Sequence, residues 1–165
     1  MRRSAELKID LNFKDIFERT AFHLACINGH SKLVEMLMQK STVLNIELNV
    51  KDEYGWTAFH RACKDGHSKM AETLMQKSAL LNIDLNVKDN TGQTAFSLAC
   101  EYGQSNVADM LIQKSAEFNI DLNAKDDVGQ TPFHLACAYV HWSCGHSNVA
   151  EMLIQKSGEF NIDLL

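Results

Sequence analysis

The apolar residues of this chain recur in blocks that each predict two short helices. Between residues 68 and 77 they form one stripe, at spacings of one, three and four: Met70, Ala71, Leu74 and Met75. Such spacing is typical of an amphipathic helix with one buried face. The preceding segment AFHRACKD predicts a shorter helix that begins after the N-cap Thr57 and ends at Gly66. Because two short helices cannot cover their own apolar faces, each block must stack on its neighbours.

The block occurs four times, and each copy begins 37 residues after the one before. The segments TAFHLAC, TAFHRAC, TAFSLAC and TPFHLAC start at Thr20, Thr57, Thr94 and Thr131. A charged turn precedes each of them, and we call these turns fingers one to four (residues 14–19, 51–56, 88–93 and 125–130). The sequence therefore predicts a single domain over residues 1–165. It divides into a partial unit with the first finger at 4–19 and repeats at 20–56, 57–93, 94–130 and 131–165.

The block resembles the ankyrin repeat family. The family's turn and helix start, its Gly-His second helix and its closing D-V-N appear here as KDEYGWTAFHRAC, DGHSKMAETLM and IDLNVKD. Pro132 occupies the family's proline position at the first residue of a helix, where a missing N–H costs nothing. The resemblance implies an all-α solenoid of stacked helix pairs with projecting hairpin fingers. It also implies a role in protein–protein binding, and no catalysis.

Each repeat is four residues longer than the usual ankyrin period of about 33 residues. Four residues are close to one helical turn of roughly 3.6 residues. We expect the second helix to gain a turn that keeps its apolar residues in register, these being Leu44, Leu81, Phe118 and Phe160. Its end should then be a left-handed asparagine, at Asn45, Asn82, Asn119 and Asn161. An extended segment is the alternative, because Leu81, Ile83 and Leu85 alternate with polar residues.

Two further departures are local. Glu18 stands where the other fingers have glycine, so a left-handed tip would be strained there and the first finger should differ in shape. The segment 140–144 lengthens the turn between the helices of the fourth repeat, and we expect it to be dispensable for folding.

Charge and hydropathy argue against nucleic acid as a partner and against a membrane-spanning segment. The net charge is −5 with both signs interspersed, which argues against nucleic acid as a partner. No apolar run approaches the roughly 18 to 20 residues of a membrane span, and the first residues do not resemble a signal peptide. We therefore expect a location in the cytoplasm, with the nucleus as an alternative. The C-terminal part has no polar cap, which predicts self-association through its apolar residues: Met152, Leu153, Ile154, Phe160, Ile162, Leu164 and Leu165.

The cysteines and histidines also follow the repeat. One cysteine per repeat occupies a single helix position, where we expect free thiols that fill the core: Cys26, Cys63, Cys100 and Cys137. The resemblance implies structural hydrogen bonds for two sets of histidines. One set is at the helix starts (His23, His60, His134) and the other at the Gly-His turns (His30, His67, His146). The four residues Cys137, His141, Cys144 and His146 are a zinc candidate, but their spacing is not standard and two of them already have structural roles. We expect neither a metal nor a cofactor.

The partner site is expected on the concave face formed by the fingers and the first helices, which carries contacts in the family. The corresponding residues here are Phe17, Arg19, Glu53, Tyr54, Trp56, Arg61, Lys64, Asp65, Asn90, Gln93, Glu101, Tyr102, Asp127, Gln130 and Tyr139. Tyr54, Trp56, Arg61 and Tyr102 should form the centre, because exposed aromatic and arginine side chains often dominate binding. Alanine at Trp56 should then weaken binding without changing stability. The alternative is that Tyr54 or Trp56 packs on the neighbouring finger.

The predicted function is that of a scaffold or adaptor that binds a protein or an extended peptide. The second hypothesis is an inhibitory or regulatory subunit of a signalling or transcription complex. The third is a metal- or thiol-responsive switch in the inserted loop of the fourth repeat.

Overall fold

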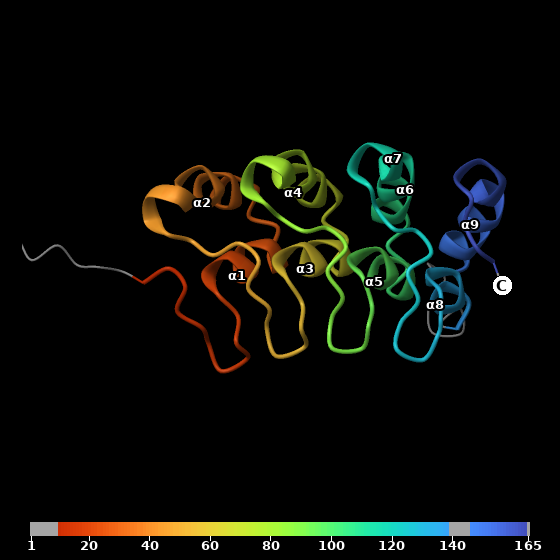
Figure 1. Cartoon of the computed structure of the whole chain (residues 1–165), viewed down its shortest axis with the longest axis horizontal. Helices are drawn as coiled ribbons and strands as arrows, with labels where there is room; N and C mark the ends of the chain where they lie inside the picture. Colours follow the sequence, from red (N-terminus) through yellow and green to blue (C-terminus); the bar gives the residue numbers. More distant parts are fainter. Residues whose placement is uncertain (1–9, 139–145, 165) are drawn as a thin grey trace, which may run out of the picture.

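The structure, a computed structural model, describes residues 10–138 and 146–164. Over these residues it contains nine helices, connected by turns and fingers, arranged as a row of helix pairs (Figure 1). The inner helices are α1 (Ala21–Ile27), α3 (Ala58–Lys64), α5 (Ala95–Glu101) and α8 (Pro132–Ala138). The outer ones are α2 (Ser31–Leu44), α4 (Ser68–Leu81), α6 (Ser105–Gln113), α7 (Ser115–Phe118) and α9 (His146–Phe160). The fingers project below the inner helices. No helix in the described residues is long and apolar enough to cross a membrane.

Threonine side chains cap three of the inner helices, α3, α5 and α8. The hydroxyl of Thr57 accepts the backbone N–H of His60, and Thr94 caps α5 in the same way. Left-handed glycines, for example Gly66 with φ 78°, then turn the chain from α1, α3 and α5 into their outer partners.

The four extra residues lengthen the outer helices. Both α2 and α4 run for 14 residues and end at Asn45 and Asn82, which adopt left-handed conformations with φ 52° and 53°. Asn119 and Asn161 have the same conformation. The predicted extra turn is therefore confirmed in α2 and α4, and the alternative of an extended segment from Leu81 is wrong. In the third repeat the helix breaks at Lys114, and the extra turn is the separate helix α7. The predicted register holds for Leu81, Phe118 and Phe160, which pack against the core, but not for Leu44, which is 50% exposed.

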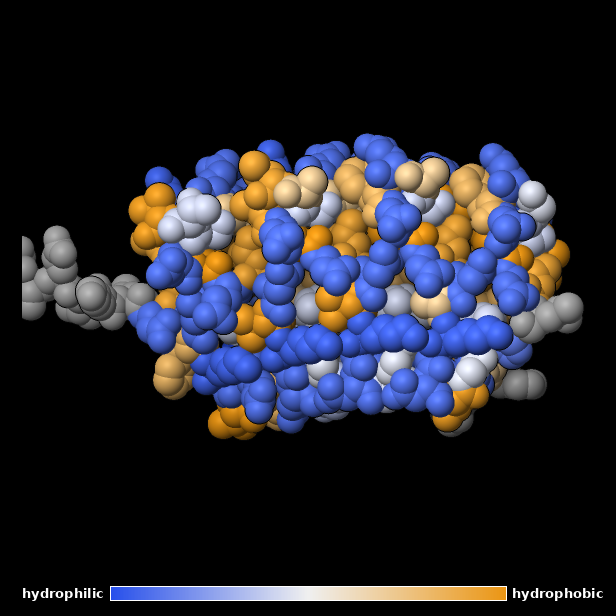
Figure 2. Space-filling model, in the orientation of Figure 1, coloured by the Kyte–Doolittle hydropathy of each residue, from blue (hydrophilic) through white to orange (hydrophobic). Residues whose placement is uncertain are grey.

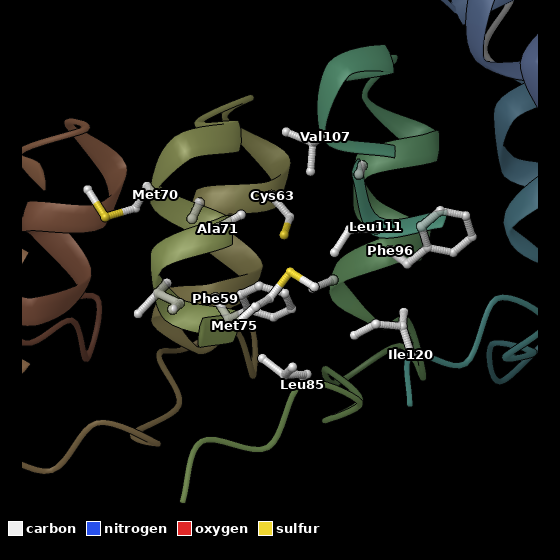
Figure 3. Close-up of a cluster of buried hydrophobic side chains, with 14 of the residues drawn as sticks. Phe59, Cys63, Met70, Ala71, Met75, Leu85, Phe96, Val107, Leu111 and Ile120 are labelled. Carbon is white, nitrogen blue, oxygen red and sulfur yellow. The ribbon is translucent and has the colours of Figure 1, made fainter. Parts of the chain in front are cut away.

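The core is continuous, because the two helices of each pair pack on each other and on the neighbouring pairs. Figure 3 shows side chains of the second and third repeats meeting in this core, among them Phe59, Met75 and Leu111. The thiols of Cys26, Cys63 and Cys100 are buried and free, as expected for small core residues. Cys137 is also free, but it is exposed, so the prediction that it fills the core is wrong. Its helix α8 packs against α5 and α9, and the described residues provide no further inner helix beyond it.

The first finger has the same shape as the others, which corrects the prediction that it differs. Glu18 adopts the left-handed conformation, with φ 58°, that glycine adopts in the other fingers. Its N–H donates to the carbonyl of Asp15, as the N–H of Gly55 does to Asp52. The finger thus keeps its hydrogen bonds and accepts the strain of a non-glycine residue at the tip.

Most of the apolar residues near the C-terminus are covered. Leu153 and Ile162 are buried in the core, and Met152, Phe160 and Leu164 pack against it. Ile154 alone among the described members of this set is exposed, at 52%. The expectation that the whole set lies uncovered is therefore wrong, and self-association through this end stays a prediction that rests on Ile154. The inserted segment 140–144 lies outside the described residues.

Polar side chains join each repeat to the next through main-chain carbonyls. Nζ of Lys51 donates to the carbonyl of Lys88 at 2.7 Å, and Nζ of Lys88 to that of Lys125 at the same distance. The Asn49 amide likewise reaches the carbonyl of Asn82. Figure 2 shows a continuous hydrophilic band across this face, above the fingers. The stack is thus held by repeated polar contacts as well as by its core.

Candidate partner-binding site

An aspartate at its base shapes each finger. Oδ1 of Asp52 accepts the backbone N–H groups of Tyr54 at 2.9 Å and Trp56 at 3.0 Å, which closes the turn. Asp15, Asp89 and Asp126 make the corresponding pairs of bonds in the other fingers. The finger side chains are therefore presented from a rigid main chain.

Adjacent fingers are also bonded to each other. The N–H of Asn90 donates to the carbonyl of Tyr54 at 3.1 Å, and its side-chain amide donates to the carbonyl of Glu53 at 2.9 Å. These bonds fix the third finger beside the second, so residues of both can contribute to one surface.

Three aromatic rings gather where fingers two and three meet the inner helices. We call Tyr54, Trp56 and Tyr102 the aromatic cluster. The rings of Tyr54 and Trp56 stack with centroids 5.0 Å apart. The Arg61 guanidinium lies 4.4 Å from the Trp56 centroid, and Nζ of Lys64 lies 4.3 Å from the Tyr102 centroid. These distances are within the range of cation–π attraction.

Trp56 is both a surface residue and a contact between fingers. Its ring is half-buried, and its indole Nε1 donates to Oδ2 of Asp89 in the third finger at 2.7 Å. The alternative that Trp56 packs on the neighbouring finger is therefore correct for this residue. Tyr54 is more open, at 51% exposed, and stacks on Trp56 within its own finger.

Arg61 connects the aromatic cluster to the base of the second finger. Its Nε donates to Oδ2 of Asp52 at 2.8 Å, and its Nη2 donates to the same oxygen. The Arg61 side chain is only 11% exposed and the Asp52 side chain is fully buried. The prediction that Arg61 projects from the surface is thus wrong, because its guanidinium joins the base of the finger to α3 beneath the Trp56 ring.

The aromatic cluster borders a hollow of about 410 Å³ between fingers two and three. We call it the finger hollow. Its lining is formed by Glu53, Tyr54, Trp56, Asp89, Asn90, Thr91, Gln93, Leu98, Glu101 and Tyr102. Tyr102, at the C-terminal end of α5, is 41% exposed. The hollow therefore offers ring faces, amides and carboxylates on one surface.

A larger hollow of about 510 Å³ lies elsewhere, between Asn12, Asn45 and Asn49. Its polar groups are engaged in joining repeats, since the Asn12 amide donates to the carbonyl of Asn45 and Asn12 Oδ1 accepts from the N–H of Glu47. A similar hollow recurs one repeat later, beside Asn82 and Asn86. Such a recurring feature belongs to the repeat architecture, whereas the aromatic lining of the finger hollow is particular to one place.

The structure brings together only part of the predicted site. The finger hollow unites seven of its residues: Glu53, Tyr54, Trp56, Asn90, Gln93, Glu101 and Tyr102. Lys64 and Asp65 lie beside it and pair with each other at 3.3 Å. Phe17 and Arg19 form a separate contact on the first finger, 4.7 Å from guanidinium to ring centroid. Asp127 and Gln130 belong to the fourth finger and do not line the hollow, and Tyr139 lies outside the described residues.

Asp89 is a lining residue that the predicted site omitted. The sequence did contain a signal for it, because it follows a lysine at the same repeat position as Asp52. Leu98, which forms part of the lining, carries no such signal, since leucine at this position looks like an ordinary core residue.

Structural partners are present for His23, His67 and His134 and for Nδ1 of His60, whereas the buried Nε2 of His60 has no hydrogen-bond partner among the described residues. Nδ1 of His23 lies 3.0 Å from the Thr20 hydroxyl, and its Nε2 lies 3.1 Å from the carbonyl of Trp56 in the next finger. Nε2 of His67 lies 2.8 Å from the carbonyl of Ile27. Gln104 makes the equivalent bond in the third repeat, where its amide donates to the carbonyl of Lys64. Burial lowers the pKa of His60 to about 4, so that this ring is neutral near pH 7.

The zinc candidate cannot be assembled from the described residues. Cys137 is exposed on α8, His141 and Cys144 lie outside the described residues, and no side-chain position is described for His146. No group of three or more potential ligands for a metal ion occurs among the side chains that the structure describes.

Comparison with known proteins agrees with the stacked architecture. The family model described as ankyrin repeats (3 copies) matches residues 4–89 and again residues 77–164. No curated protein matches the chain significantly. The two matches together span the helix pairs, the fingers and the finger hollow. With this coverage and this fold, the chain belongs to the ankyrin repeat family.

Proposed function

We propose that this chain is an adaptor that binds a protein partner, through an extended segment of that partner, at the finger hollow. Ankyrin repeats are in general protein–protein interaction modules, and this supports the class of function. The aromatic cluster is the observation that supports the finger hollow as the proposed binding site. Aromatic side chains with large exposed faces, grouped around a hollow, are the usual centres of binding energy in interfaces.

The repeat itself supplies a comparison within the chain. At the position of Tyr102 the first repeat has Asn28, and at the position of Tyr54 the third finger has Thr91. Both alternatives occur in the same fold, since Asn28 and Tyr102 end their helices with nearly identical φ and ψ. The fold therefore does not require these rings, and binding is a reason for their presence.

A comparative capture experiment tests the proposal. The full chain, Tyr102→Asn and Tyr54→Thr are immobilised and exposed to a cell lysate, and bound proteins are quantified by mass spectrometry. The control is Leu80→Glu, which alters a side chain that is 78% exposed on α4 and introduces the residue found at Glu117 in the third repeat. We expect at least one protein to be retained by the chain and the control but lost with both hollow variants, at unchanged melting temperatures. Equal retention by all four proteins would contradict the proposal.

The buried free thiols of Cys26, Cys63 and Cys100 favour a reducing compartment for this activity, and we extend the proposal to the cytoplasm. Fluorescence microscopy of the tagged chain checks this location.

A further inference from the structure

The charged residues that line the finger hollow are all acidic. These residues are Glu53 on the second finger, Asp89 on the third and Glu101 on α5. Lysine and arginine are absent from the described lining residues. Three carboxylates around one hollow create a negative potential that favours a positively charged ligand.

The charges of these carboxylates are not neutralised by cations of the chain. Oδ1 of Asp89 accepts the N–H groups of Thr91 and Gln93, and its Oδ2 accepts the indole N–H of Trp56. Glu101 accepts from the Gln93 amide at 2.8 Å. All of these donors are neutral. Among the described side chains, no lysine or arginine lies within ion-pair distance of the three lining carboxylates.

The two nearest cations have carboxylates of their own. Arg61 pairs with the buried Asp52, and Lys64 pairs with Asp65. Both also lie over rings of the aromatic cluster, Arg61 over Trp56 and Lys64 over Tyr102. The rings are therefore oriented so that positive groups can approach their faces, and they already attract such groups within the chain.

We infer that the finger hollow accepts a lysine or arginine side chain from an extended basic segment of the partner. The aliphatic stem of that side chain would lie against the rings of Tyr54 and Trp56, and its charged end would face the carboxylates. The volume of about 410 Å³ accommodates such a side chain together with water. This inference rests on the proposed function, because it specifies what binds at the same hollow.

Peptide libraries supply the probe. Four sets of nonapeptides carry lysine, arginine, norleucine or glutamate at the central position, with mixed residues elsewhere. Norleucine has nearly the length of lysine without its charge, so it separates the electrostatic contribution from the apolar one. Binding is followed by NMR through the indole N–H signal of Trp56, in the full chain carrying Trp142→Phe so that Trp56 is its sole tryptophan.

We expect the lysine and arginine libraries to shift the Trp56 signal at concentrations about tenfold lower than the norleucine library. Glu53→Gln with Glu101→Gln should remove most of that difference, since only Asp89 then remains charged in the lining, and raising the salt concentration should reduce it. Glu117→Gln, which removes an exposed carboxylate on α7, is the matched control and should leave the difference intact. Melting temperatures verify that every variant is folded.

The possible failures are distinguishable. If norleucine or glutamate peptides bind as well as lysine peptides, the charge preference is wrong while peptide binding at the hollow stands. If no library shifts the Trp56 signal or the backbone signals of the second and third fingers, both the inference and the proposed function fail.

Discussion

The indole Nε1 of Trp56 donates a 2.7 Å hydrogen bond to Oδ2 of Asp89, which lies one finger further along the chain. The same ring faces the Arg61 guanidinium, which is bonded to the buried Asp52. Asp52, Arg61, Trp56 and Asp89 thus form a connected series of contacts from the second finger to the third. The geometry of the finger hollow depends on this series.

Trp56→Gln introduces the residue that the third and fourth fingers have at this position, Gln93 and Gln130. We expect the free energy of unfolding to fall by about 2 kcal/mol, because the variant loses a hydrogen bond to a charged group and the stacking of two rings. This differs from the expectation, based on the sequence, that replacing Trp56 would leave stability unchanged. Urea denaturation measures the effect. The control is Val128→Thr on an exposed finger tip, and a loss no larger than that of the control would contradict the prediction.

Arg61→Leu should destabilise the chain by about 3 to 5 kcal/mol, although leucine occupies the equivalent position in the other three repeats. The reason is that Asp52 would remain buried and charged without its partner. In the double variant with Asp52→Asn, the amide oxygen can still accept from the finger and no buried charge remains. Denaturation of both single variants and the double variant forms a thermodynamic cycle. Additive losses would show that the pair is not coupled.

Stability should fall in mildly acidic solution. Burial, the largest cause, lowers the pKa of His23 and lowers that of His60 to about 4, while an unfolded histidine titrates near 6.5. The unfolded chain therefore binds protons that the folded chain does not, between about pH 6.5 and pH 4. This lowers the free energy of unfolding by about 1.4 kcal/mol per pH unit for each fully shifted histidine, and the stability is fully present above pH 6.5.

His60→Ser tests this pH dependence. Serine occupies the equivalent position at Ser97, where its hydroxyl lies 3.1 Å from that of Thr94, so the N-cap region can be kept. Between pH 7.5 and pH 5.0 the parent chain should lose about 2 kcal/mol more than the variant. Equal losses, measured by urea denaturation at both pH values, would exclude His60 as the cause.

Glu18→Gly should stabilise the first finger. Glycine removes a left-handed strain of about 1 to 2 kcal/mol, and the greater freedom of glycine in the unfolded chain offsets about 0.5 to 1 kcal/mol of that gain. The ion pair between Lys14 and Glu18 that is lost is exposed and contributes little. We expect a small rise in melting temperature, whereas the reverse change, Gly55→Ala, should lower it. A fall with Glu18→Gly would indicate that the Glu18 side chain has a role of its own.

The sequence was sufficient to predict the elements that repeat. The left-handed asparagines, for example Asn82, follow from an insertion of about one helical turn and from the tolerance of asparagine for that conformation. Both depend only on residues close together in the sequence, and the pattern occurs in four copies. The same argument explains why the threonine caps were predicted correctly.

The role of Arg61 could not be predicted in this way. Asp52 lies nine residues earlier, and the two side chains meet only because the finger folds back against α3. The other repeats have leucine at the position of Arg61, which makes arginine look like a surface variation. Glu18 shows a similar limit, because the hydrogen bonds of Asp15 hold the first finger in a conformation that the residue at its tip does not favour.

His67 and Gln104 each form a hydrogen bond to a main-chain carbonyl of the preceding repeat, that of Ile27 and that of Lys64 respectively. Main-chain oxygens are the same whatever side chains a repeat carries, so this junction recognises the position of its neighbour and not the identity of its residues. A gene that duplicates or deletes a whole 37-residue unit would therefore create a new junction of the same kind. The length of the array and the residues of its fingers can then evolve independently of each other.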